Sequence, residues 1–369
     1  MIKHFPKLSK KKKPIVPKFY LDNGCICKSL KEVDNHFYIC EYENQSFLPS
    51  RFIYPGDEII NTLVEDYCVR LYDVFQNKIF TDESEYYKYF DFLPQGITRA
   101  GLDSDFDLPK ENFGNYFEDK LGNTLLSFMD SRPEYLDEIF NVLDARKYKY
   151  AYLADCQSLV NSLQELILTS HSNFISFYKQ LGDFSVNHDF SDDVYYAITT
   201  EGRMIFGTLT SLIISLYSCF DILTKISFEL ENIPVLEDHY ERIQSRNILF
   251  GGASRIKNIN KENTIFSKTR EIAIIENLRN ELVHNAVWEM NPKIFIHKNN
   301  RQLMKKVIYL PDFNEDGHLI TYKNRKRFFS QQTELNVELP GIYFSVLNAI
   351  GTTLQRLLLL DDSITPLSL

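Results

Sequence analysis

Glycine and proline are scarce in this chain, which has 14 and 13 of them among 369 residues. Flexible linkers and low-complexity tracts are rich in these residues, so we expect neither. Cysteine is also sparse, and its six positions are scattered along the sequence. This distribution favours reduced thiols in a cytoplasmic protein over a disulfide framework.

The chain lacks an excess of positive charge, since its formal net charge is −9 at pH 7. Nothing in the overall charge therefore indicates a nucleic-acid partner. The cations are concentrated in two places, however. Residues 1–18 contain seven lysines and no acid, which predicts a mobile basic tail, and residues 293–327 hold nine Lys or Arg against three Asp or Glu. A nucleic acid would have to contact such local patches.

Long hydrophobic runs are also missing. The longest uncharged run, residues 204–220, has seventeen residues and includes Gly, Thr, Ser, Tyr and Cys. That length is marginal for crossing a bilayer, so we expect a core helix and no membrane partner. The N-terminal lysines are followed by Pro14, Pro17 and polar residues, a pattern unlike that of a signal peptide.

Residues 19–150 are predicted to form a mostly helical N-terminal region with a small β part, whose function the sequence does not indicate. Short apolar runs before residue 50 alternate with polar residues, which predicts one or two small strands. From Gly56 onward apolar residues recur at helical spacing. Two further helical patterns lie at 116–130 and 134–148.

Residues 151–362 are predicted to form a bundle of four amphipathic helices, which makes the fold mainly α. Helices of this length normally bury their apolar stripes against one another. Between the third and fourth helices the apolar spacing changes to alternation, which predicts a small antiparallel β insert near 293–323. The predicted helices are 151–181, 201–231, 264–288 and 340–360.

The third of these helices contains the residues best suited to chemistry: Arg279, Asn280 and His284. Histidine exchanges a proton near neutral pH, so it can act on a ribose 2′-hydroxyl or on a departing 5′-oxygen. Arginine offers a permanent charge and a planar fork of donors that matches phosphate oxygens. Together they can cleave RNA without a metal ion or another cofactor.

Arginine, a polar residue directly after it and a histidine four to six positions beyond the arginine form the signature of the HEPN superfamily of helical-bundle ribonucleases. Arg279, Asn280 and His284 resemble this signature, and residues 150–360 resemble the bundle. Residues 212–230, with Ser218 and Asp221 among apolar side chains, look like the helix that precedes the motif in such proteins. The resemblance implies catalysis by Arg279 and His284 and a homodimer with a composite cleft. It also implies that Asn280 orients His284 or contacts phosphate.

The spacing of the motif imposes a geometric condition. On an ideal α-helix, side chains five positions apart diverge by about 140°, so Arg279 and His284 do not share a face. A helix that ends or distorts near His284 would bring them together. A second copy of the motif across a two-fold axis is the other solution.

A cluster of cations in the insert suits single-stranded RNA, because aromatic side chains that can stack on bases accompany it. We predict that Lys323, Arg325, Lys326 and Arg327 bind RNA, beside Tyr322, Phe328 and Phe329. A solvated hairpin edge protected by charge is the competing interpretation.

Two segments contain the residue types of a metal site. Cys25, Cys27, His36 and Cys40 can be arranged as four zinc ligands, although their spacing matches no common zinc pattern and a small hairpin explains it equally well. Asp105 and Asp107 lie in a segment similar to a nucleotidyltransferase magnesium motif. The expected serine of that motif is replaced by Ile97, so an acidic loop is favoured, and we predict no metal.

The sequence therefore predicts a metal-independent endoribonuclease of the HEPN type, with a role in bacterial defence or a toxin system by resemblance alone. A non-catalytic bundle for dimerisation or ligand binding is the alternative. In that case Arg279 makes an ordinary surface ion pair with Glu276, and His284 interacts only with the helix dipole.

Overall fold

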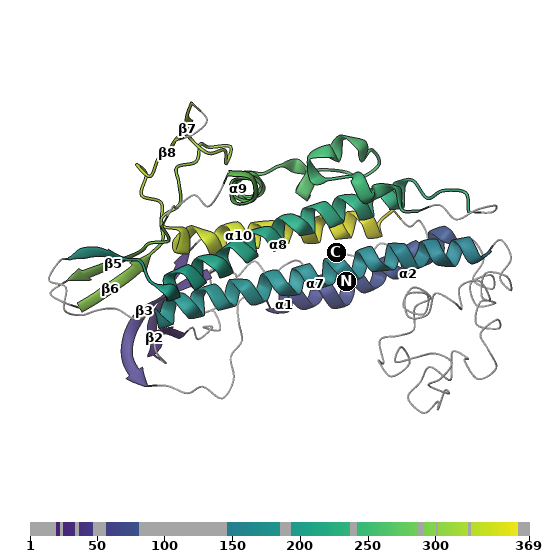
Figure 1. Cartoon of the computed structure of the whole chain (residues 1–369). Coiled ribbons are helices and arrows are strands. Elements are labelled where there is room, and N and C mark those ends of the chain that lie inside the picture. Colours follow the sequence, from purple (N-terminus) through teal and green to yellow (C-terminus); the bar gives the residue numbers. More distant parts are fainter. Residues whose placement is uncertain are drawn as a thin grey trace, which may run out of the picture.

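The computed structural model describes residues 20–22, 25–33, 37–46, 57–80, 146–184, 193–236, 242–285, 291–299, 302–323 and 326–360. In these parts the protein is mostly helical with small antiparallel sheets (Figure 1), which confirms the mainly α fold class. The basic tail, the patterns at 116–130 and 134–145, and Asp105 and Asp107 lie outside the described residues.

Long helices form the body of the molecule. They are α1 (Asp57–Asn61), a π-helical segment (Thr62–Cys68), α2 (Val69–Ile79), α7 (Arg146–Asp183), α8 (Thr200–Glu231), α9 (Arg270–Asn280) with a π-helical extension (Glu281–Asn285), and α10 (Leu335–Leu358). Short 3₁₀ turns occupy Gln244–Asn247, Phe250–Arg255 and Ile265–Ser267. The strands are β1 (Tyr20–Asp22), β2 (Cys25–Val33), β3 (Phe37–Ser46), β4 (Val194–Ala197), β5 (Ile294–Asn299), β6 (Gln302–Val307), β7 (Thr321–Tyr322) and β8 (Lys326–Arg327).

All four predicted C-terminal helices form, but they do not all lie side by side. Figure 1 shows α7, α8 and α10 along one another, whereas α9 is seen end-on and crosses over α8 and α10. The helix from 57 to 79 takes the remaining place beside α7. Its side chains bond to both neighbours: Tyr72 donates to Gln164 of α7 at 2.9 Å, and Gln355 of α10 donates to Tyr67 at 2.6 Å. Residues on both sides of the predicted boundary at 150 thus share one core.

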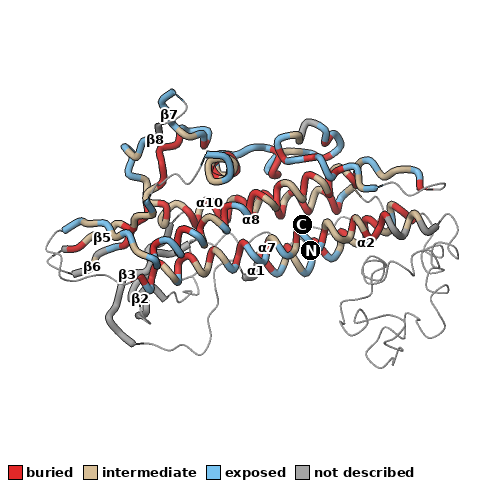
Figure 2. The backbone as a smooth tube through the Cα atoms, viewed as in Figure 1, coloured by how far each residue is buried: buried red, intermediate tan, exposed pale blue. Residues whose placement is uncertain are grey.

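The long apolar helix α8 is buried among the others. Figure 2 shows buried stretches along α7, α8 and α10, whereas the turns around β7 and β8 are mostly exposed. Residues 204–220 lie within α8 and form a core helix, as predicted. It is the one helix in the described part of the chain with the length and composition to cross a membrane, and 56% of its most apolar 18 residues are buried in the protein.

The fourth helix begins five residues before the predicted start at Pro340. Proline has no N–H, so the carbonyl of Asn336, four residues earlier, loses its usual helical partner. The hydroxyl of Tyr178 donates to this carbonyl at 2.8 Å. A long-range hydrogen bond from α7 therefore lets α10 continue through a residue that normally marks a helix start.

The predicted insert is antiparallel, as its alternating pattern indicated, but it contains two sheets. β5 and β6 form a hairpin, and β4 adds a third strand from before α8 that the sequence did not indicate. At the end of the predicted insert a short strand, Thr321–Tyr322, pairs with β8 and not with β6. Near the N-terminus, three strands form in the order β1-β2-β3, where one or two were expected. Cys25, Cys27 and Cys40 lie on β2 and β3, but the side chains of these strands and all of His36 lie outside the description.

Asp312 holds the second part of the insert together. Its carboxylate is buried and accepts hydrogen bonds from the N–H and hydroxyl of Ser330 and from the N–H of Gln331. Burial alone would raise the pKa of this carboxyl, but the hydrogen bonds outweigh burial and lower the pKa below its ordinary value. One ionised side chain thus joins the second part of the insert to the segment that follows β8.

Replacing Asp312 with Asn should lower the free energy of unfolding by about 1–3 kcal/mol, because one acceptor oxygen becomes an NH2 donor and the other loses its charge. The pKa is depressed in the folded state, so this stabilisation is present near neutral pH and disappears as the pH falls through the lowered pKa, below about 4. Urea unfolding of both proteins at neutral and acidic pH measures the difference. An equal gap at every pH would show that the carboxylate charge is not responsible.

Candidate active site

The motif lies where α9 changes its helical form. The N–H of Glu281 is shared between the carbonyls of Asn277 and Leu278, and from this residue to Asn285 the chain is π-helical. A π-helix bonds residues five positions apart, so a side chain five positions later falls on the same face. The structure therefore distorts the helix before His284, one of the two solutions that the sequence left open.

This π-helical turn brings Arg279 and His284 together. Nη1 of Arg279 lies 3.3 Å from Nε2 of His284 within one chain. The histidine is exposed and the arginine is half-buried. Because a guanidinium only donates hydrogen bonds, Nε2 must act as the acceptor in this contact. An arginine cation and a ring nitrogen that accepts a hydrogen bond thus lie side by side at the surface.

Asn280 is bonded to the arginine. Its side-chain oxygen accepts a hydrogen bond from Nη1 of Arg279 at 3.1 Å. The sequence led us to expect that this amide would orient His284 or contact phosphate. In the structure it fixes one edge of the guanidinium, and the bonds to Asn280 and His284 use two of the five guanidinium N–H groups.

The ring of Tyr217 on α8 packs against the guanidinium of Arg279. The Cζ atom of Arg279 lies 4.6 Å from the centre of the tyrosine ring, within the range of a cation–π contact. Only 7% of Tyr217 is exposed. Burial, and then the carboxylates of Asp221 and Glu276, raise the pKa of its hydroxyl to about 12, although Arg279 acts in the opposite direction. The ring is therefore neutral at physiological pH and offers a fixed apolar face.

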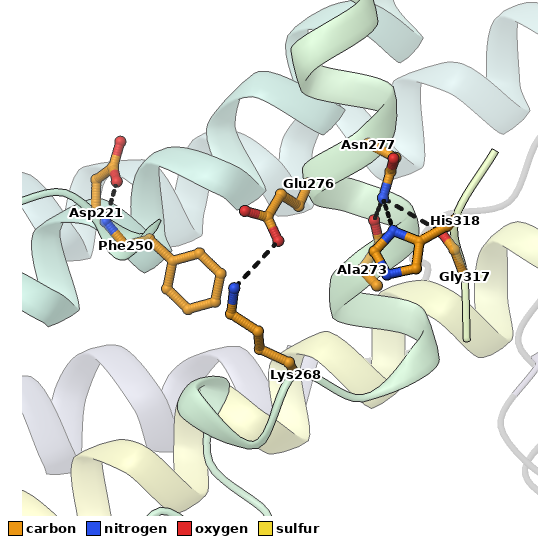
Figure 3. Close-up of polar contacts among 8 residues, drawn as sticks. All are labelled: Asp221, Phe250, Lys268, Ala273, Glu276, Asn277, Gly317 and His318. Carbon is orange, nitrogen blue, oxygen red and sulfur yellow. Dashed lines mark hydrogen bonds and ion pairs between the residues drawn. The ribbon is translucent and has the colours of Figure 1, made fainter. Parts of the chain in front are cut away.

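Two carboxylates near this stack are engaged elsewhere, as Figure 3 shows. Asp221 accepts the N–H of Phe250 at 2.8 Å, which holds that aromatic ring beside Tyr217. Glu276 forms an ion pair with Lys268 at 3.9 Å. The surface pair between Glu276 and Arg279, which the non-catalytic interpretation expects, is absent from the ion pairs of the described residues. The guanidinium stacks on Tyr217 instead.

The insert docks on the motif helix at two points. Asn277 donates to the carbonyl of Gly317 at 3.4 Å and lies 3.2 Å from Nδ1 of His318 (Figure 3). One turn later, Glu281 forms an ion pair with Arg327 of β8. Burial lowers the pKa of that guanidinium from its usual value, but arginine stays charged at physiological pH. The helical turn that carries His284 is thus braced by the insert.

Gly317 makes this docking possible. Its φ is +81°, a conformation that side chains rarely adopt, and a Cβ there would fall on the carbonyl oxygen of Arg270. The turn can approach α9 this closely only because no side chain intervenes.

The predicted RNA-binding cluster is only partly described. Lys323 is exposed, and its Nζ lies 5.4 Å from the ring centre of Tyr322. Arg327 is the partner of Glu281. Arg325 and the side chain of Lys326 lie outside the described residues. RNA binding by this cluster stays a prediction. Arg327 also has a structural role, because it forms an ion pair with the motif helix.

Comparisons with protein-family models, with curated proteins and with solved structures found no match for this chain. Within the described ranges no three His, Cys, Asp or Glu side chains are grouped as metal ligands would be. The geometry of the chain itself is therefore the basis for any functional conclusion.

Replacing Arg327 with Gln should loosen the insert without unfolding the helices. A partly exposed ion pair contributes about 1 kcal/mol, so amide hydrogens around Ile320 should exchange about fivefold faster. Lys323→Gln, a neighbouring exposed cation, is the matched control and should leave exchange unchanged. The charge-swapped double variant E281R/R327E should restore protection in hydrogen–deuterium exchange. If Lys323→Gln and Arg327→Gln speed up amide exchange equally, the ion pair between Arg327 and Glu281 is not specifically responsible for the protection.

Proposed function

We propose that this protein is a metal-independent endoribonuclease of the HEPN type. The observation that carries the proposal is the contact between Arg279 and His284, which a π-helical turn creates at the exposed end of α9. Such π-helical turns are uncommon and frequently occur at functional sites. A bundle that includes α7, α8 and α10, with the motif on a helix after α8, is compatible with the resemblance drawn from the sequence.

The chemistry follows from the two side chains. Nε2 of His284, which accepts from Arg279 in the structure, can remove the proton from a ribose 2′-hydroxyl once a phosphate takes up the guanidinium. The resulting oxygen attacks the adjacent phosphorus and a 2′,3′-cyclic phosphate forms. The bond to the 5′-oxygen breaks as that oxygen takes up a proton, from the imidazolium or from water. Arg279 stabilises the negative charge that develops on the phosphate oxygens, and Tyr217 with Asn280 keeps its donors in place.

The partners follow from the same proposal. Single-stranded regions of RNA would be the substrate, and a homodimer in the cytoplasm would be the working form, with a role in bacterial defence or a toxin system. Val283, next to the histidine, is 50% exposed, so an apolar side chain is available for a partner beside the site. We expect each chain to hold a complete pair of Arg279 and His284.

His284→Ala should reduce RNA cleavage at least about 100-fold, because the proton acceptor is lost from a side chain that is exposed and adds little to the core. Arg279→Lys should be similarly impaired, since lysine lacks the planar fork. Arg246→Ala removes an exposed arginine of another segment and should retain activity. Cleavage of a labelled RNA, with and without EDTA, measures these effects. Full cleavage by His284→Ala, or complete dependence on Mg²⁺, would show that the residues are wrongly assigned.

Mixing the Arg279→Ala and His284→Ala proteins should not restore cleavage, because the two side chains contact each other within one chain. The measurement is the rate of the mixture after the subunits have been allowed to exchange, compared with each variant alone. Recovery of a substantial part of the wild-type rate would instead support a site shared between two chains. A wild-type protein that cleaves no RNA would favour the non-catalytic bundle.

A further inference from the structure

The sheet β4–β5–β6 carries a row of three aromatic rings across its strands. Tyr196 of β4 lies opposite Phe295 of β5 in the strand register, with ring centres 5.9 Å apart. Tyr309, just after β6, continues the row at 4.8 Å from Phe295. These residues belong to no part of the site on α9.

This row lies on the open face of the sheet. On the other face Ile294 and Ile296 are buried in the core. On the aromatic face, Tyr196 is 55% exposed and its neighbour two positions earlier, Val194, is 53% exposed. A cross-strand aromatic pair stabilises a sheet even when it is covered, so stability alone does not require a ring this accessible.

Cations accompany the exposed ring. Nζ of Lys293 lies 5.6 Å from the centre of the Tyr196 ring. Lys305 of β6 lies opposite His297 on the same face and forms an ion pair with Glu334, so its charge is partly offset. Accessible aromatic faces beside lysines are the combination that binds single-stranded nucleic acid, where bases stack and phosphates are neutralised.

We propose that this face binds the single-stranded RNA that flanks the cleaved bond, with a base stacked on Tyr196. The inference rests on RNA being the ligand of the proposed function. Lys293 follows His284 by nine positions in the sequence, so the two residues lie at most about 32 Å apart. One RNA strand can therefore occupy both the sheet and the cleavage site.

Tyr196→Val tests the stacking directly, because valine keeps the preference for a strand and removes the ring. The probe is a fluorescein-labelled oligouridylate of about twelve nucleotides, long enough for such a surface. Binding is measured by anisotropy in the His284→Ala background, so that no cleavage interferes. We expect Kd to rise about tenfold. Val235→Thr, a change at an exposed valine outside this sheet, should leave Kd unchanged.

Photocrosslinking gives an independent readout. With 5-bromouridine in the same oligonucleotide, mass spectrometry should locate the crosslink at Tyr196. An unchanged Kd for Tyr196→Val, together with crosslinks elsewhere, would overturn the RNA face while leaving the nuclease proposal intact. Tenfold weaker binding by Tyr196→Val, combined with a wild type that cleaves no RNA, would support the face and reject the nuclease. If the oligonucleotide does not bind at all, or if only a peptide strand binds along β4, the face is not an RNA site.

Discussion

The burial of α8 is the constraint on which the rest of the structure depends. This helix packs against α7, α9 and α10, and its leucine, isoleucine and phenylalanine side chains occupy the centre of the core. The same helix presents Tyr217 to the candidate site, so the support of Arg279 cannot shift without disturbing the core. A rigid, buried platform of this kind keeps a catalytic cation in one orientation more reliably than a loop would.

Carboxylates at the C-terminal end of α8 hold the irregular chain between α8 and α9. Glu231 accepts the N–H groups of residues 257, 258 and 259, and the fully buried Glu229 accepts that of Ser245. A backbone N–H without a partner is costly in a packed environment. These side chains let a segment with little regular structure lie against the core and lead into α9.

Local periodicity was enough to predict the existence of the helices, whereas Arg279 and His284 were singled out by their chemistry and by the spacing of the motif. It was not enough for the start of α10, which depends on Tyr178, or for β4, which depends on pairing with β5 about a hundred residues later. The crossing of α9 was equally hidden, and the distortion near His284 was only one of two options, since both features involve contacts of the insert and α8 with this helix. Tyr217 was missed because a tyrosine on an apolar helix normally indicates only core packing.

Gly317 gives the docked insert a simple sequence marker. The backbone of this turn touches the backbone of α9, so the fit depends on the absence of a single methyl group. In any related chain, an alanine at the corresponding position would keep the insert at a distance from the motif helix, whatever the charges of its arginine and glutamate. The residue at this one position therefore indicates whether the insert of a related chain can support the π-helical turn that carries His284.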